Sequence, residues 1–287
     1  MMRLRIAISL LIGAVAVCPA GAETILFVGN SFTYGANSAV QHYQPERVTD
    51  LNGERVGGVP ALFKTFADAA GLSYEVSLET APGKGLDWHM AERRGRIDRH
   101  WDHVVLQSYS TLDADRPGDP TTLIASVRQL AALFRARNPA VDLRLEATWA
   151  RADQTYRPGG YWYGRPIAAM TEDVRRGYDL AGKGVRAAVV PVGQAWTLAM
   201  TTGVADPNPY DGTTYGQVDL WSWDQYHASN AGYYLSALTL FGSITGRDPT
   251  LLGRQERAAA ELGLSPDQAA ALQRVARDML IEERARP

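Results

Sequence analysis

Short apolar runs alternate with helical patterns along most of this chain, and this alternation constrains the fold more than any other feature of the sequence. Five runs are predicted as strands, namely Thr24–Gly29, Tyr74–Thr80, His103–Gln107, Leu143–Thr148 and Ala187–Val192. The first, third and fifth are nearly continuous runs rich in Val, Ile and Leu, which is typical of strands covered on both faces. The runs therefore predict a parallel sheet inside the molecule.

Helical patterns with one apolar side lie between and after these runs. They span Val59–Ala70, Thr121–Arg137, Ile167–Leu180 and Ala228–Thr245, and Gly246 closes the last one. Ser265-Pro266-Asp267-Gln268 has the pattern of a capping box at the start of a further helix. Alternation of strand and helix predicts one three-layer α/β/α domain over residues 23–287, built on a five-stranded parallel sheet.

Residues 1–22 have the pattern of a secretory signal peptide. A basic start containing Arg3 and Arg5 precedes an apolar stretch over Ile6–Val17, and Ala20-Gly21-Ala22 forms a small-x-small site before Glu23. About 12 apolar residues are too few to span a bilayer as a helix. The chain has 29 basic and 31 acidic residues, so loss of the two leader arginines leaves 27 against 31, a net charge of −4. The predicted location is periplasmic or secreted, in a bacterium.

Cysteine and lysine usage excludes several classes of site and partner. The single cysteine, Cys18, lies inside the predicted leader, so residues 23–287 hold no disulfide, thiolate metal site or cysteine nucleophile. Val17 is bulkier than the residue that usually precedes a lipid-attachment cysteine, which argues against a lipoprotein. The chain has only three lysines and a mildly negative charge, which argues against a nucleic-acid partner. No later stretch is apolar for long enough to insert stably in a membrane.

Gly29-Asn30-Ser31 ends the first predicted strand and places a serine at the carboxyl edge of the sheet. Open parallel sheets bind ligands at this edge, beside the point where strand order reverses. A helix that begins here would direct N–H groups and a partial positive charge toward an anion. Ser31 is therefore a candidate nucleophile, and a turn or helix-capping role is the alternative.

A serine nucleophile needs a base, and the base needs a group that orients it. The histidines are His42, His89, His100, His103 and His227. His227 follows Asp224 by three residues, so the carboxylate can bind one ring nitrogen while the other faces a hydroxyl; helix capping is the alternative. His100 and His103 have the spacing of metal ligands but no carboxylate cluster beside them, and we interpret them as solvated surface. No metal and no organic cofactor is expected.

These two segments together resemble the SGNH (GDSL-like) hydrolase superfamily. Gly29-Asn30-Ser31 is similar to its first block, with Asn in place of the commoner Asp, and Asp224-x-x-His227 is similar to its last. The resemblance implies a flavodoxin-like SGNH fold with Ser31 as nucleophile, His227 as general base and Asp224 as its orienting group. The segments GNSFT, VVLQ, Thr148–Arg151 and Pro191–Trp196 resemble the uncharacterised bacterial DUF4886-type branch.

The resemblance also implies three donors for an oxyanion hole. They are the N–H of the nucleophile, a glycine N–H after the second strand and a side-chain amide after the third. Ser31, Gly83 and Gln107 are matched to these donors, the glutamine replacing the asparagine of the usual Gly-x-Asn-Asp block. The alternatives are Gly85 for the second donor and Ser110 or Tyr109 for the third.

Three long stretches, Asn37–Gly58, Asp153–Pro166 and Val204–Trp223, show no regular pattern. The last two are rich in aromatic residues, namely Tyr156, Tyr161, Trp162, Tyr163, Tyr210, Tyr215, Trp221 and Trp223. Loops of this length in a compact domain are usually functional, and their composition suits a rim that binds a sugar or an ester. Packing of the aromatic residues onto the loops' own domain is the alternative.

The expected function is that of an exported serine esterase acting on acetyl or other short acyl esters of a small molecule or polysaccharide. The alternatives are an acyltransferase with the same acyl-enzyme and a non-catalytic carbohydrate-binding protein. The α/β-hydrolase nucleophile elbow is excluded because Gly29-x-Ser31-x-Thr33 lacks its second glycine, and no GxxxxGK[ST] phosphate loop is present. Arg93–Arg99 is interpreted as a solvated helix face.

Overall fold

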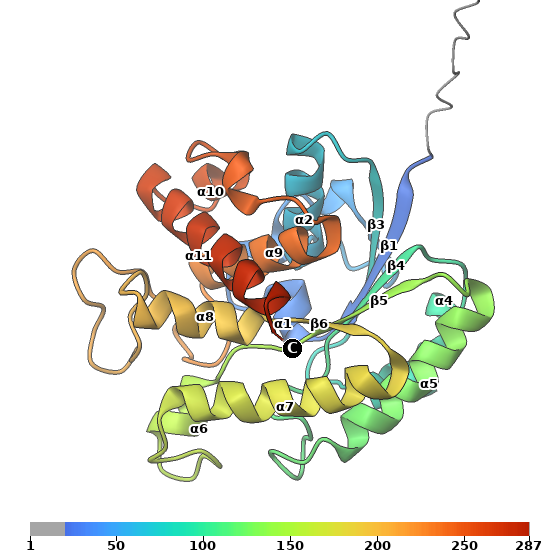
Figure 1. Ribbon diagram of the computed structural model, residues 1–287, viewed down its shortest axis with the longest axis horizontal. Helices are drawn as coiled ribbons and strands as arrows, with labels where there is room; N and C mark the ends of the chain where they lie inside the picture. Colours follow the sequence, from blue (N-terminus) through green and yellow to red (C-terminus); the bar gives the residue numbers. More distant parts are fainter. Residues whose placement is uncertain (1–20, 287) are drawn as a thin grey trace, which may run out of the picture.

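A parallel β-sheet with helices on both faces forms the centre of the computed structural model, which describes residues 21–286 (Figure 1). The strands lie in the order β2-β3-β1-β4-β5-β6, and every neighbouring pair is parallel. Their bounds are β1 Glu23–Gly29, β2 Thr49–Asp50, β3 Tyr74–Thr80, β4 His103–Leu106, β5 Asp142–Glu146 and β6 Ala188–Val190. The predicted three-layer α/β/α fold is confirmed. Residues 1–20 of the predicted leader lie outside the described residues.

The predicted number of five strands is wrong, because the structure has a sixth. Thr49–Asp50 forms β2 and pairs with Ser77 and Leu78 of β3 at one edge of the sheet. Two residues are too few to show the alternation by which strands are recognised, so this segment was expected to be irregular. The last predicted strand is also shorter than expected, since Pro191 has no N–H to donate and α8 begins at Val192.

The helices divide between the two faces of the sheet. One layer contains α2 Gly58–Ala69, α8 Val192–Thr201, α9 Asn230–Thr245 and α11 Pro266–Arg284. The other contains α3 Leu86–Glu92, α4 Arg94–Ile97, α5 Thr121–Arg137 and α7 Ile167–Val185. The shorter elements are α1 Ser31–Tyr34, η1 Ala39–His42, η2 Pro45–Arg47, α6 Ala152–Tyr156, η3 Pro249–Leu252 and α10 Arg257–Glu261. Figure 1 shows α9 and α11 on the side of the sheet opposite α5 and α7.

Strand β1 contributes to the apolar cores on both sides of the sheet. Ile25 and Phe27 pack in one core, whereas Leu26 and Val28 pack in the other, and all four are fully buried. Continuous apolar sequence in β1 is therefore explained by burial on both faces.

Capping fixes the start of the last helix, α11. The Ser265 side chain accepts from the backbone N–H of Gln268, and the Gln268 side chain accepts from the N–H of Ser265. This reciprocal arrangement confirms the predicted capping box.

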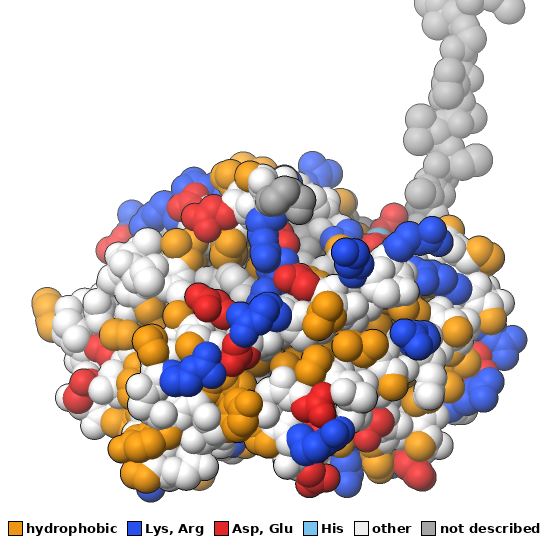
Figure 2. Space-filling model, turned by 60° about the horizontal axis from the view of Figure 1, so that its bottom comes forward, with side chains coloured by type: hydrophobic (Ala, Val, Ile, Leu, Met, Phe, Trp, Pro, Cys, Tyr) orange, Lys and Arg blue, Asp and Glu red, His pale blue; other side chains and the backbone are white. Residues whose placement is uncertain are grey.

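Charged side chains of both signs are interspersed on the face drawn in Figure 2, in line with the formal net charge of −2. Among residues 21–286, no helix combines the length and apolar character needed to cross a bilayer.

Candidate active site

The turn between β1 and α1 places Ser31 at the carboxyl edge of the sheet. Ser31 is the first residue of α1 and is 5% exposed. Gly29 has to be a glycine here, because a Cβ would lie 2.1 Å from Thr33 Oγ1 and 2.7 Å from Gln107 Oε1. Asn30 caps the short helix, since its Oδ1 accepts from the N–H of Phe32 at 3.1 Å. The turn is therefore tightly defined on both sides of the serine.

Asn30 and Gln107 join the loops that follow β1, β3 and β4. Gln107 Oε1 accepts from the N–H of Asn30 at 2.9 Å and from the Thr33 hydroxyl at 3.1 Å. Asn30 Nδ2 donates to the carbonyl of Lys84 at 2.9 Å and to that of Ser108 at 3.2 Å. These contacts hold the Ser31 turn against its two neighbouring loops.

Asp224 and His227 form a hydrogen-bonded pair just before α9. Asp224 Oδ2 lies 2.6 Å from His227 Nδ1, and Oδ1 accepts from the backbone N–H groups of Tyr226 at 3.1 Å and His227 at 2.9 Å. Burial alone would raise the pKa of Asp224, but the His227 side chain and the two N–H donors outweigh it and hold the pKa below its ordinary value. The carboxylate is therefore ionised and binds one ring nitrogen.

The other ring nitrogen, His227 Nε2, is buried and has no hydrogen-bond partner among residues 21–286. It is therefore not bonded to Ser31 Oγ. The Phe32 ring, next to Ser31, lies 5.8 Å from the imidazole between ring centroids. Catalytic hydrogen bonds are often long in unliganded enzymes and tighten when substrate binds.

Three further hydrogen bonds hold the segment from Ser31 to Asn37 beside the His227 segment. The Tyr233 hydroxyl, on α9, donates to the carbonyl of Ser31 at 3.1 Å. Asn37 Nδ2 donates to Asp224 Oδ2 at 2.7 Å, and Ser222 Oγ donates to the carbonyl of Asn37 at 2.9 Å. Two segments almost 200 residues apart in sequence are thus packed at one edge of the sheet.

Sequence reasoning missed Asn37 and the structural role of Tyr233. Asn37 lies in a stretch without periodicity, and its only local signal is a left-handed backbone with φ 59°, which asparagine adopts more readily than most residues. Tyr233 lies among the apolar residues of the predicted helix Ala228–Thr245, and nothing in that pattern indicates a partner for its hydroxyl. Their roles depend on the pairing of distant segments.

The backbone N–H groups of Ser31 and Gly83 are the first two predicted donors of the oxyanion hole. No backbone carbonyl among the described residues accepts from either. Gly83 is exposed, with a positive φ of 67°, in the loop that Asn30 holds through Lys84. At Gly85, by contrast, a Cβ would lie 2.1 Å from the Tyr109 ring. Gly85 is therefore explained by close packing, and Gly83 remains the preferred match.

Gln107 is predicted to donate its side-chain amide to an oxyanion, but in the structure this amide bonds to neighbouring protein groups. Its side chain is fully buried, its oxygen accepts the two bonds described above, and its Nε2 donates to the carbonyl of Ser108. The position supports a role in holding the Ser31 turn rather than the role of third donor. The two alternatives are also constrained: Ser110 is 5% exposed, and Tyr109 packs against Gly85.

The aromatic residues of the long loops divide into a buried and an exposed set. Trp162 and Trp221 are fully or almost fully buried, which fits the alternative that loop aromatics pack onto their own domain. The exposed residues are Trp223 at 76%, Tyr161 at 57%, Tyr163 at 54%, Tyr210 at 40% and Tyr215 at 102%. Trp223 directly precedes Asp224, so an exposed indole lies beside the His227 segment.

His103 departs from the interpretation as solvated surface. Its ring lies between Glu23 Oε2 at 2.9 Å and Asp142 Oδ2 at 3.2 Å, with a side chain only 15% exposed. Burial would lower its pKa, but the two carboxylates outweigh this effect and raise it. Within residues 21–286, no group of three or more His, Cys, Asp or Glu side chains is arranged to hold a metal ion.

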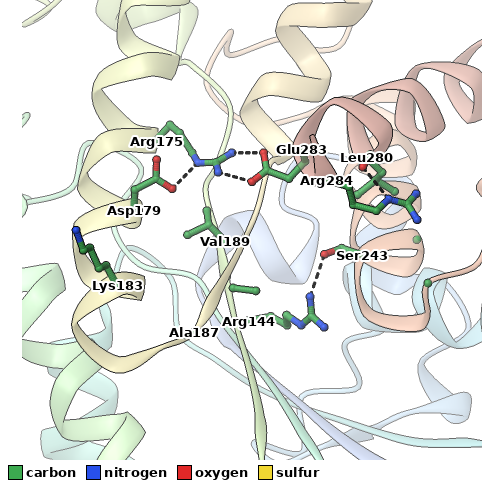
Figure 3. Close-up of a pocket in the computed structure, with 13 residues that line it drawn as sticks. Arg144, Arg175, Asp179, Lys183, Ala187, Val189, Ser243, Leu280, Glu283 and Arg284 are labelled. Carbon is green, nitrogen blue, oxygen red and sulfur yellow. Dashed lines mark hydrogen bonds and ion pairs between the residues drawn. The ribbon is translucent and has the colours of Figure 1, made fainter. Parts of the chain in front are cut away.

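A pocket of about 420 Å³ lies between α7, β6, α9 and α11 (Figure 3). Its most buried cation, Arg175, bonds Asp179 at 2.8 Å and both carboxylate oxygens of Glu283. The pair of Arg175 and Glu283 ties α7 to α11, and none of the predicted site residues lines this pocket. We interpret it as a structural junction.

Comparison with known proteins identifies the fold. No family model and no curated protein sequence matches the chain significantly. A DUF4886 family protein from Bacteroides uniformis is 20% identical with a TM-score of 0.62, over 91% of this chain and 95% of that one. A protein from Slackia heliotrinireducens assigned to the SGNH hydrolases is 20% identical with a TM-score of 0.52, over 78% and 100%. The acetylxylan esterase Axe2 from Geobacillus stearothermophilus is 16% identical with a TM-score of 0.53, over 78% and 95%.

The chain therefore has the fold of the SGNH hydrolases. This confirms the fold that the sequence resemblance implies, with a DUF4886 family protein among the similar structures.

Proposed function

We propose that this chain is a serine esterase that hydrolyses carboxylic esters through Ser31, His227 and Asp224. The observation that carries the proposal is the orientation of the His227 imidazole beside the Ser31 turn. An ionised carboxylate binds its Nδ1, while its Nε2 is buried and has no hydrogen-bond partner in the part of the chain that the structure describes. An imidazole oriented in this way is the general base that a serine hydroxyl requires.

The proposed reaction gives each of these groups one role. His227 Nε2 takes the hydroxyl proton as Ser31 Oγ attacks the ester carbonyl, and Asp224 stabilises the imidazolium that forms. The N–H groups of Ser31 and Gly83 bind the oxyanion of the tetrahedral intermediate. His227 returns the proton to the leaving alcohol, which leaves an acyl group on Ser31. Water then attacks this acyl-enzyme by the same route and releases the carboxylic acid.

We infer an acetyl or other short acyl ester of a carbohydrate as the substrate. Trp223 is 76% exposed and directly precedes Asp224, and its indole offers a flat apolar surface of the kind on which sugar rings stack. The similarity in fold to an acetylxylan esterase supports the same class.

We also propose export with removal of residues 1–22. Strand β1 begins at Glu23, directly after the predicted cleavage site, and the N–H of Glu23 donates to the carbonyl of Ser73 at 3.0 Å. Cleavage there would leave β1 whole. N-terminal sequencing of protein recovered outside the cytoplasm should begin at Glu23, and a full-length N-terminus would contradict cleavage.

Labelling with a fluorophosphonate tests the nucleophile. We expect one covalent adduct, located on Ser31 by mass spectrometry, together with hydrolysis of 4-nitrophenyl acetate. Ser31→Ala should abolish both, whereas Ser243→Ala, at the far end of α9, should retain both. Absence of labelling in the folded wild type would favour a non-catalytic carbohydrate-binding protein. Acyl transfer to added glycans in preference to water would favour an acyltransferase.

A further inference from the structure

A second pocket, of about 290 Å³, lies beside the loop that carries Gly83. Thr80, which lines it, pairs with Gly29 in the register of β3 and β1, so the pocket opens at the same edge of the sheet as Ser31. Lys84 also lines it, and the carbonyl of Lys84 accepts from Asn30, the residue before the candidate nucleophile. A molecule in this pocket would therefore lie at the edge of the sheet that carries Ser31 and beside the loop that carries Gly83.

The lining of this pocket contains three cationic side chains held in place by their neighbours. Lys84 Nζ lies 5.8 Å and the Arg93 guanidinium carbon 4.6 Å from the centre of the Trp88 ring, within the range of cation–π attraction. Arg96 donates to the carbonyl of Leu51 at 3.1 Å, which fixes its guanidinium without neutralising it. Trp88 and the Leu51 carbonyl thus hold three positively charged side chains at the lining of one pocket.

Few carboxylates oppose these cations. Among the described residues, neither Lys84 nor Arg96 has a carboxylate within 4.0 Å. Arg93 lies 3.6 Å from the buried carboxylate of Glu79, which also contacts His89. Glu54 is the only acidic residue in the lining. An excess of positive charge therefore faces the pocket, and it attracts an anionic group.

We propose that this pocket binds the carboxylate of an acidic sugar, so that the substrate is an acylated polysaccharide containing hexuronate residues. This inference rests on the proposed esterase function. A guanidinium presents paired N–H donors that match a carboxylate, and a lysine adds a point charge. The pocket is at the small end of ligand sites, which suits one sugar residue, and its charged lining does not suit a long acyl chain.

The kinetic test compares acetate release from O-acetylated polygalacturonate with release from O-acetylated mannan, a neutral polymer. The wild type should prefer the acidic polymer, and the preference should fall as salt is added. Lys84→Met should reduce the acidic-to-neutral ratio of kcat/KM about five- to tenfold, as expected for loss of one charge-assisted contact. Lys183→Met is the matched control, because Lys183 is also exposed but lines the distant pocket of Figure 3. Its ratio should equal that of the wild type.

A binding test separates this inference from the esterase proposal. Ser31→Ala protein should bind unacetylated trigalacturonate, measured by calorimetry, and the added Lys84→Met change should weaken binding by a similar factor. If the wild type shows no esterase activity but the protein still binds trigalacturonate through Lys84, the acidic-sugar pocket stands and the proposed reaction does not. Esterase activity with equal rates on both polymers, or trigalacturonate binding that Lys84→Met does not weaken, would overturn the acidic-sugar pocket.

Discussion

Glu146, the last residue of β5, is a fully buried carboxylic acid. Its side chain is 0% exposed, and neither carboxylate oxygen has a hydrogen-bond partner among the described residues. Burial raises its pKa to about 8, because water that would stabilise the charged form is excluded. The folded protein therefore carries Glu146 in its protonated form at neutral pH.

The raised pKa makes stability fall as pH rises. The unfolded chain loses this proton near pH 4.5, whereas the folded chain keeps it until about pH 8, so the folded state binds the extra proton between these values. Each pH unit in that window lowers the free energy of unfolding by about 1.4 kcal/mol. The loss reaches about 3 kcal/mol at pH 7 and about 5 kcal/mol above pH 8.

Glu146→Gln removes the titration while it keeps the size of the side chain. We expect the variant to match the wild type in stability near pH 4 and to exceed it by about 3 kcal/mol at pH 7 and more at pH 9. Urea unfolding followed by tryptophan fluorescence at the three pH values measures these differences. Glu75→Gln, an exposed position on β3, is the matched control and should show no such trend. A difference between Glu146→Gln and wild type that is the same at all three pH values would refute the reasoning.

Three further predictions concern the site. Asp224→Asn should lower kcat on 4-nitrophenyl acetate by about 10³–10⁴-fold, because the amide cannot hold His227 in the required tautomer; a loss under threefold would exclude the pair from catalysis. Asn37→Ala should lower kcat about tenfold through loss of its bond to the Asp224 carboxylate, and an unchanged kcat would show that this bond does not orient Asp224. Gln107→Ala should destabilise the fold by about 1–3 kcal/mol, since the buried N–H of Asn30 loses its acceptor. A calorimetric melting temperature equal to that of wild type would contradict that role for Gln107.

The sheet and the long helices that cover it could be predicted, because burial of an element requires apolar residues at regular spacing in its sequence. β1 and β3 match their predicted spans almost to the residue, and the capping box at Ser265 marks the start of α11. Several short elements escaped prediction, and for two of them the reason is local. The strand β2 has only two residues, and helix α8 follows Pro191 within a stretch that resembles a continued strand.

The candidate site could be located from sequence, but its supporting contacts could not. Asp224 and His227 are three residues apart, so their pairing is a local property that a motif can record. The bond between Gln107 and the backbone N–H of Asn30 could not be predicted, because the two residues lie 77 positions apart in the sequence. No periodicity or composition encodes which loop a buried amide will face.

The bond from the Tyr233 hydroxyl to the carbonyl of Ser31 has a consequence for timing. Ser31 lies near the beginning of the polypeptide. His227 and Tyr233, whose hydroxyl holds the Ser31 turn, are synthesised much later. Under the proposed mechanism, a chain in which α9 has not yet packed on the sheet holds Ser31 without its base and has no esterase activity. The onset of hydrolysis during refolding would then report the docking of α9.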